Sequence, residues 1–243
     1  MPTTVDLALL SDAVYQNGAS TVTGPAPAGA VSTPFSPPPA ACMIPQATPQ
    51  PRVWTKQAFS YNRAGFYAGL YTSGTDRVIA FRGTNDLIDG LVDDTAIFAG
   101  GVPPQVLAAF ATVNSWSSGN TYLTGHSLGG ALAILAACRY NLPCVTFNAP
   151  GVADSCVMIA RFNNSLERLL AEVSRCRGNP RVHNIRINGD PVSSWFTTGS
   201  QAGGNVREYS GASCGFDMLC RHGIATCLDA VRSDPANFVD LHL

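Results

Sequence analysis

Apolar and polar residues follow one another along this chain with two different periods. Several segments carry apolar residues at the three-to-four-residue spacing of a buried helix face. Others are short β-prone runs bounded by glycine, asparagine or proline. The pattern predicts helices over Asp6–Tyr15, Val106–Trp116, Leu128–Tyr140, Val157–Cys176 and Ile224–Val231. It predicts strands over Ala64–Tyr71, Arg77–Phe81, Thr121–Thr124, Cys144–Asn148 and Arg181–Ile187.

The order of these segments predicts the fold class. The first two strands are joined by a short turn, and later strands alternate with helices long enough to cross over to a parallel neighbour. We therefore expect an α/β protein with a mostly parallel central sheet and helices on both faces. A chain of 243 residues, 46% of them hydrophobic and 13% charged, can bury one substantial core, so we expect a single domain over residues 1–243.

Two stretches interrupt the periodic pattern. Residues 24–51 are rich in proline, alanine, glycine, serine and threonine and include Pro37-Pro38-Pro39, which excludes a core strand or helix. We expect a surface excursion there. Residues 86–104 mix apolar residues with four aspartates, Asp86, Asp89, Asp93 and Asp94. This segment is either a cover over a site or an ordinary surface helix with one buried stripe, and the pattern alone favours neither.

The strongest chemical signal is Gly125-His126-Ser127-Leu128-Gly129, which lies between the strand over Thr121–Thr124 and the helix from Leu128. A sharp strand-to-helix turn at a serine needs neighbours without Cβ atoms, which the flanking glycines provide. The turn also places the serine at a helix N-terminus, where unpaired N–H groups favour a developing anion. A G-x-S-x-G match alone can arise by chance, but here strand, turn and helix occur in the required order. We expect Ser127 to be a nucleophile.

A serine hydroxyl needs a histidine base, and the chain has four histidines. His126 adjoins Ser127 on the turn, so its side chain should point away from the hydroxyl and serve as a packing or hydrogen-bonding neighbour. His183 lies within a strand pattern, and His242 is the penultimate residue. His222, between Cys220 and Cys227 and just before a helix, is the candidate base. We expect it in a loop that a disulfide could fix.

In α/β-hydrolases the acid follows the serine and precedes the histidine along the chain, which leaves Asp154, Asp190 and Asp217. Asp190 comes directly after a strand, with Gly189 allowing a sharp turn and Pro191 keeping the aspartate extended. Asp154 lies where a helix cap is the simpler interpretation. Asp217 is only five residues from His222. Asp190 is therefore the candidate acid.

Charge and cysteine content narrow the class of protein. The net charge of −1 gives no basic field for nucleic acid or anionic lipid, and no apolar run is long enough to span a membrane. The N-terminus has no recognisable signal peptide. Eight cysteines without a C-x-x-C pair favour disulfides in a secreted protein over zinc sites or reduced thiols. Cys138 could instead be a small buried side chain.

The chain is similar to the class 3, fungal-lipase-like branch of the α/β-hydrolases in a series of motifs. In chain order these are LSDAVY, GFYAGLY, VIAFRGT, DLIDGLVDD, LTGHSLGGALA, TFNAPGV, NGDPV and HGIATCLDAV. The resemblance covers most of the sequence. It implies Ser127 as nucleophile, Asp190 as acid and His222 as base. It also implies an oxyanion hole from Thr84 and the N–H of Leu128, with the segment after FRGT as lid.

We therefore expect a carboxylic ester hydrolase that acts on lipid or other apolar esters, possessing the α/β-hydrolase fold and working as a secreted monomer. An acyltransferase or phospholipase would use the same residues, and a lipid-binding protein could keep the fold without turnover. We expect no cofactor and no metal. The four aspartates of residues 86–94 lack the glycine turn and terminal glutamate of an EF-hand.

Overall fold

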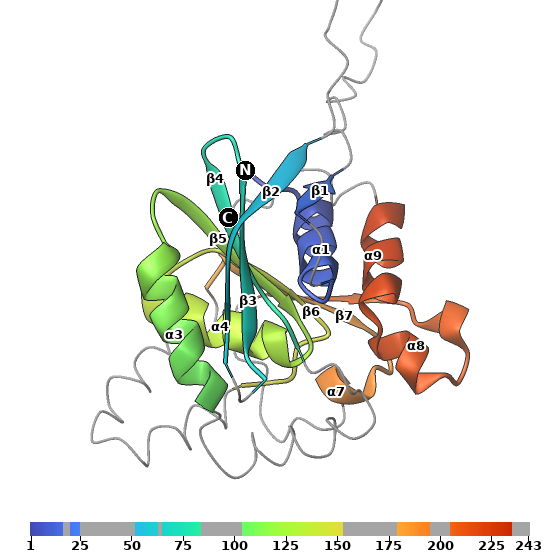
Figure 1. The fold of residues 1–243 in the computed structure, drawn as a ribbon. Helices are drawn as coiled ribbons and strands as arrows, with labels where there is room; N and C mark the ends of the chain where they lie inside the picture. Colours follow the sequence, from blue (N-terminus) through green and yellow to red (C-terminus); the bar gives the residue numbers. More distant parts are fainter. Residues whose placement is uncertain are drawn as a thin grey trace, which may run out of the picture.

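The computed structural model of the chain describes residues 1–16, 20–24, 52–62, 65–83, 104–152, 179–194 and 205–234. Its centre is an eight-stranded sheet in the order β1 to β8 along the chain (Figure 1). The strands are β1 (Thr21–Thr23), β2 (Val53–Tyr61), β3 (Tyr67–Ser73), β4 (Asp76–Phe81), β5 (Asn120–His126), β6 (Cys144–Phe147), β7 (Val182–Ile187) and β8 (Asn205–Tyr209).

The sheet changes from antiparallel to parallel pairing at β4. Strands β1 to β4 pair antiparallel, and β4 to β8 pair parallel. The carboxyl ends of β4, β5, β6 and β7 therefore meet at one edge of the sheet. This is the edge at which open α/β sheets place their functional side chains.

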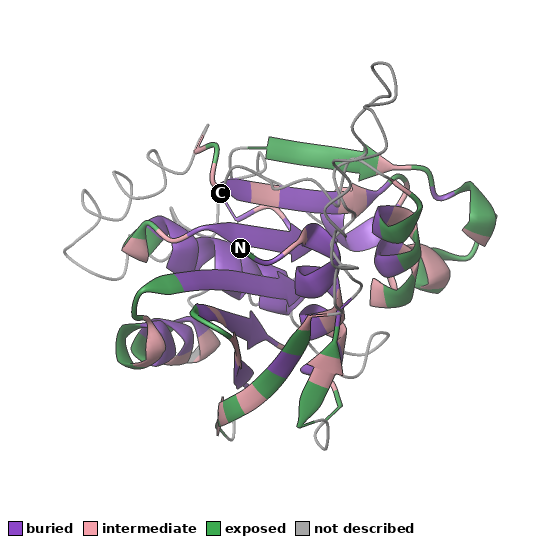
Figure 2. Ribbon diagram, turned by 90° about the horizontal axis from the view of Figure 1, so that it is seen from above, coloured by how far each residue is buried: buried purple, intermediate pink, exposed green. Residues whose placement is uncertain are grey.

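Helices cover both faces of the sheet, as Figure 1 shows. On one face, α3 (Pro104–Trp116) and α4 (Leu128–Tyr140) pack over a core that includes Ile79 and Leu123. On the other, α1 (Thr4–Ala13) and α9 (Ile224–Ser233) pack over a core that includes Tyr122 and Phe147. Adjacent residues of β5 face opposite cores because side chains alternate along a strand. In Figure 2 the central strands are buried on both faces, as parallel strands between helix layers are.

The predicted fold class is confirmed: the structure is an α/β-hydrolase fold with a mostly parallel sheet. The helices beginning at residues 4, 104, 128 and 224 agree with the sequence pattern, as do the strands β3 to β7. The expected helix over 157–176 lies outside the described residues, as do the excursion over 24–51 apart from its first residue and the segment 86–104 apart from its last.

Six described elements were not predicted. Strands β1 and β2 precede the first expected strand, and β8 falls within the glycine-rich residues 199–215. The other three are the short helices α7 (Pro191–Ser194), η2 (Ala212–Cys214) and α8 (Met218–His222). The last of these corrects the expectation that His222 lies in a loop, because His222 is the final residue of α8.

The cysteines in the described part of the chain include both paired and free ones. Cys214 and Cys220 form a disulfide, and Cys138 is also disulfide-bonded, so the interpretation of Cys138 as an unpaired buried side chain is wrong. Cys144 and Cys227 are free and buried, and burial raises the pKa of both thiols. The Cys214–Cys220 disulfide thus ends two residues before His222, whereas Cys227, on the other side of His222, is free.

Candidate active site

Ser127 occupies the sharp turn between β5 and α4. Its backbone has φ 57° and ψ −131°, a conformation that L-residues rarely adopt and that is stabilised only by its surroundings. Its N–H donates to the carbonyl of Phe147 at 3.0 Å, and its carbonyl accepts from the N–H of Ala131 at 3.2 Å. The turn is therefore fixed on both sides, and the side chain of Ser127 remains partly exposed.

Glycines permit this turn, as the sequence predicted. A Cβ atom on Gly125 would lie 2.5 Å from the backbone of Gly129, and one on Gly129 would lie 2.2 Å from the carbonyl oxygen of Phe81. A Cβ on Gly83 would lie 3.2 Å from the Cβ of Ser127. The start of α4 and the end of β4 therefore approach the serine at distances that only glycine allows.

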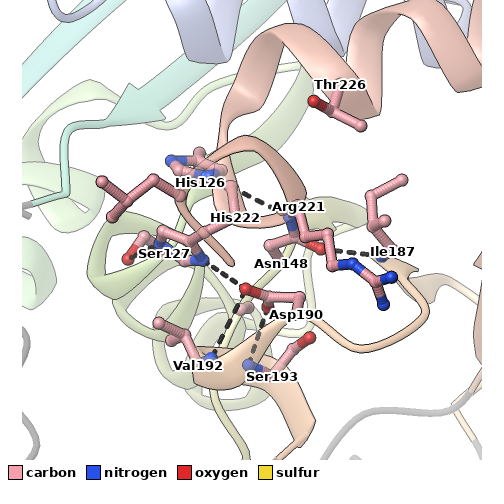
Figure 3. A network of polar contacts seen from close by, with 12 residues as sticks. His126, Ser127, Asn148, Ile187, Asp190, Val192, Ser193, Arg221, His222 and Thr226 are labelled. Carbon is pink, nitrogen blue, oxygen red and sulfur yellow. Dashed lines mark hydrogen bonds and ion pairs between the residues drawn. The ribbon is translucent and has the colours of Figure 1, made fainter. Parts of the chain in front are cut away.

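The structure brings Ser127, His222 and Asp190 together in one hydrogen-bonded chain (Figure 3). Nε2 of His222 lies 2.9 Å from Oγ of Ser127, and Nδ1 lies 2.7 Å from Oδ1 of Asp190. A carboxylate can only accept, so Nδ1 carries the proton and Nε2 offers its lone pair to the serine hydroxyl. The histidine and the aspartate are fully buried, so little water competes for these contacts.

Asp190 is held at the start of α7 (Pro191–Ser194). Gly189, with φ 77°, turns the chain after β7. The Asp190 carboxylate accepts hydrogen bonds from the N–H groups of Val192 at 3.4 Å and Ser193 at 2.8 Å. These donors hold the carboxylate in its buried position and fix its direction toward His222. The residue thus acts as a helix cap and as the partner of the histidine at once.

The main chain at His222 is held by two side chains from neighbouring strands. Nε2 of His126 donates to the His222 carbonyl at 2.6 Å, and Nδ2 of Asn148 donates to it at 3.0 Å and to the Arg221 carbonyl at 2.9 Å. Oδ1 of Asn148 accepts from the N–H of Ile187 at 2.8 Å. Asn148 therefore ties the ends of β6 and β7 to the helix that carries the histidine.

His126 points away from the serine hydroxyl, as expected, and belongs to a second polar chain. Burial, and next the nearby His222, lower the pKa of His126 to about 3, so the ring is neutral. Because Nε2 donates to a carbonyl, Nδ1 accepts from the Tyr15 hydroxyl at 3.1 Å. The Tyr15 oxygen in turn accepts from the N–H of Gly83 at 3.1 Å. This chain joins the end of β4 to the main chain of His222.

The other candidate residues lie apart from this chain. His183 is on β7, where burial lowers its pKa. Asp217 caps α8 by accepting from the N–H groups of Leu219 and Cys220. Leu128 is the first residue of α4, so its N–H has no carbonyl partner within the helix. Thr84, Asp154, His242 and the lid segment up to residue 103 lie outside the described residues.

Sequence reasoning missed Asn148 and Tyr15 as site residues. Asn148 has φ 46°, a conformation that asparagine tolerates better than most residues, and it directly follows a buried strand. An asparagine at the carboxyl end of a core strand was therefore an available signal. Tyr15 contacts residues 68 and 111 positions away, which no local pattern reveals.

The described residues contain no group of three or more histidine, cysteine, aspartate or glutamate side chains placed to hold a metal ion. None of the helices in that part of the chain combines the length and apolar character needed to cross a bilayer.

The sheet, the strand–serine–helix turn and the two helix layers define this protein as an α/β-hydrolase. It belongs to the phospholipase-like family with a Tle-like phospholipase domain, whose model matches residues 6–218. Membership of this family confirms the lipase-like character that the motifs predicted.

Individual relatives match over parts of the chain. An extracellular phospholipase A1 of Serratia liquefaciens is 39% identical over 93 residues, which cover 37% of this chain and 29% of the relative. ATG15 of Eremothecium gossypii, which is named as a lipase, is 31% identical over 150 residues, or 54% of this chain and 24% of the relative. The matched residues thus span 29% and 24% of the length of these two curated relatives. The lipase of Rhizopus microsporus var. chinensis aligns over 57% of this chain and 55% of its own, with TM-score 0.36 and 18% identity.

Proposed function

We propose that this protein is a serine carboxylester hydrolase that acts on lipid esters. Ser127 is the nucleophile, His222 the general base and Asp190 the acid that orients the histidine. The observation that supports this most is the Ser127–His222–Asp190 chain, with contacts of 2.9 and 2.7 Å on a strained strand-to-helix turn.

The first half of the reaction forms an acyl-enzyme. Oγ of Ser127 attacks the ester carbonyl carbon while Nε2 of His222 takes the hydroxyl proton. Asp190 stabilises the resulting imidazolium and keeps its Nδ1–H in place. When the tetrahedral intermediate collapses, the bond to the alcohol oxygen breaks and the alcohol leaves with the proton from His222.

The second half releases the acid. Water gives its proton to Nε2 of His222 and attacks the acyl carbon, and Ser127 then leaves as the free hydroxyl. In both halves the carbonyl oxygen becomes an oxyanion, which we propose is stabilised by the N–H of Leu128 and by Thr84. The N-terminal end of α4 contributes a favourable dipole at the same point.

The substrate class follows from the family and from the relatives. Relatives named as a phospholipase A1 and as a lipase support lipid esters, either glycerides or phospholipids, over small polar esters. We further propose that the chain acts as a single-domain monomer without cofactor, outside the cell. The disulfides support that location, because they persist in oxidising compartments.

A fluorophosphonate probe tests the proposal directly. The probe should label the wild-type protein at Ser127 and should not label Ser127→Ala, whose turnover should fall about 10⁶-fold. Asp190→Ala should reduce turnover severely, and retention of more than half of wild-type activity would exclude Asp190 as the acid. A folded wild-type protein that remains unlabelled would support a lipid-binding protein instead.

A further inference from the structure

A seven-residue segment closed by a disulfide exposes three large apolar side chains beside the candidate site. Within Cys214–Cys220, Phe216 is 103% exposed, and Met218 and Leu219 are each about half exposed. Large apolar side chains gathered in one exposed segment mark an interaction surface more often than chance exposure does. Phe216 in particular is in contact with solvent on all sides.

This segment, which we call the anchor loop (residues 214–220), is held in place by more than its disulfide. The Asp217 carboxylate caps α8 by accepting from Leu219 and Cys220. Arg221 donates from Nε to the carbonyl of Gly215 at 3.0 Å and from Nη1 to the carbonyl of Asn188 at 3.0 Å. The exposed side chains are therefore presented by a braced scaffold and are not a frayed end.

The anchor loop shares its scaffold with the acid and the base. The last two residues of α8 are Arg221 and His222, and Asn188, which Arg221 contacts, lies two residues before Asp190. In Figure 1, α8 and the turn before it project from the body of the molecule. A surface bound to the projecting loop would therefore lie beside the helix whose last residue contacts Ser127.

A second exposed apolar pair lies at the same edge of the sheet. Strand β2 is antiparallel to β3, and β3 is antiparallel to β4, so β2 runs in the direction of β4 and β5. Near its carboxyl end the exposed rings of Phe59 and Tyr61 stack, with centroids 6.1 Å apart. Exposed aromatic side chains thus occur at the edge at which β5 leads into Ser127.

We propose that the anchor loop inserts Phe216, Met218 and Leu219 into the surface of aggregated lipid, so that the ester reaches Ser127 from that surface. The proposal rests on the proposed lipid-ester hydrolysis and adds the surface that binds the substrate phase. The net charge of −1 provides no attraction to anionic lipid, so the occupant is an uncharged or zwitterionic lipid surface held by apolar contact.

Vesicles of phosphatidylcholine test the anchor with Ser127→Ala as the starting protein, so that no lipid is hydrolysed. Adding Phe216→Ser and Leu219→Ser should reduce the fraction that sediments with vesicles, weakening the partition constant about 10-fold or more. The matched control is Leu107→Ser on α3, which is 62% exposed and should leave the partition unchanged. Salt at about 1 M should not weaken binding, because it screens only charges.

Activity measurements separate this proposal from the one on which it rests. With Ser127 present, the Phe216→Ser and Leu219→Ser protein should hydrolyse a soluble short-chain ester at the wild-type rate but an emulsified long-chain ester about 10-fold more slowly. A wild-type protein inactive on both esters would contradict the hydrolase, while the vesicle assay would still test the anchor. Unchanged vesicle binding in the double variant would overturn the anchor. The anchor would also be overturned if the parent protein formed a dimer that the double variant lost while its vesicle binding stayed the same, because the loop would then serve self-association.

Discussion

Replacing Asn148 by alanine tests how the main chain of the candidate base is positioned. Asn148 is fully buried, and its side chain makes three hydrogen bonds that join Ile187, Arg221 and His222. The His222 carbonyl retains a second donor in His126, whereas the Ile187 N–H, two residues beyond the last β6–β7 pair, donates to Oδ1 of Asn148. Loss of the amide therefore removes the acceptor of a buried donor.

The magnitude follows from two contributions. An unpaired buried N–H destabilises the fold by about 1–3 kcal/mol. Placing alanine at φ 46° adds about 1 kcal/mol. We expect Asn148→Ala to reduce the free energy of unfolding by about 3 kcal/mol, measured by urea denaturation. We also expect kcat on a soluble ester to fall about 10- to 100-fold with little change in KM, because the His222 carbonyl loses one of its two hydrogen-bond donors.

Two variants make the result specific. Asn148→Gly removes the same hydrogen bonds but tolerates the positive φ, so it should be about 1 kcal/mol more stable than the alanine variant. Asn205→Ala, on the exposed strand β8, should change the free energy of unfolding by less than about 0.5 kcal/mol. An Asn148→Ala protein as stable and as active as wild type would refute the bridging role.

Two further predictions concern the turn and pH. Gly129→Ala should destabilise the fold by about 3 kcal/mol, because the added Cβ would lie 2.2 Å from the carbonyl oxygen of Phe81. Gly223→Ala is the control, because a Cβ there would meet only ordinary van der Waals contacts. Urea denaturation of the two variants measures the difference. His126 has a folded pKa of about 3, below its unfolded value, so its stabilising effect is complete above pH 6.5 and declines as pH falls toward 3. Between pH 7 and 5 this should remove about 2 kcal/mol. Burial also lowers the pKa of His183, so this residue contributes to the pH dependence of stability in the same direction. A His126→Gln protein should lose the part due to His126, and an unchanged pH slope in that variant would contradict the lowered pKa of His126.

Local sequence was sufficient for the strand, turn and helix around Ser127. The glycines, the β-prone run and the small-residue helix are contiguous, and each limits the backbone in the same way. The same holds for Asp190, where a strand end, a glycine and a proline specify the turn. These elements could be predicted because their causes lie within a few residues of one another.

The unpredicted strands have a different cause. β8 is exposed along most of its length, and β2 alternates with mostly polar, partly exposed positions, so neither shows the apolar run of a core strand. These segments become strands through main-chain pairing with a neighbouring strand, and their amino-acid composition does not reveal that pairing. The short helix α8 begins at the cap Asp217, which is a local signal, but its five residues are too few to show the spacing of a buried helix face.

The position of His222 illustrates why elimination could select the residue but not its setting. Elimination needs only the count of histidines and their order relative to Ser127. The setting requires that His126, 96 residues earlier, and Asn148, 74 residues earlier, reach one carbonyl from the ends of β5 and β6. Since parallel strands deliver such residues to a common edge, the sheet topology, more than any motif near residue 222, places this imidazole within 2.9 Å of the serine.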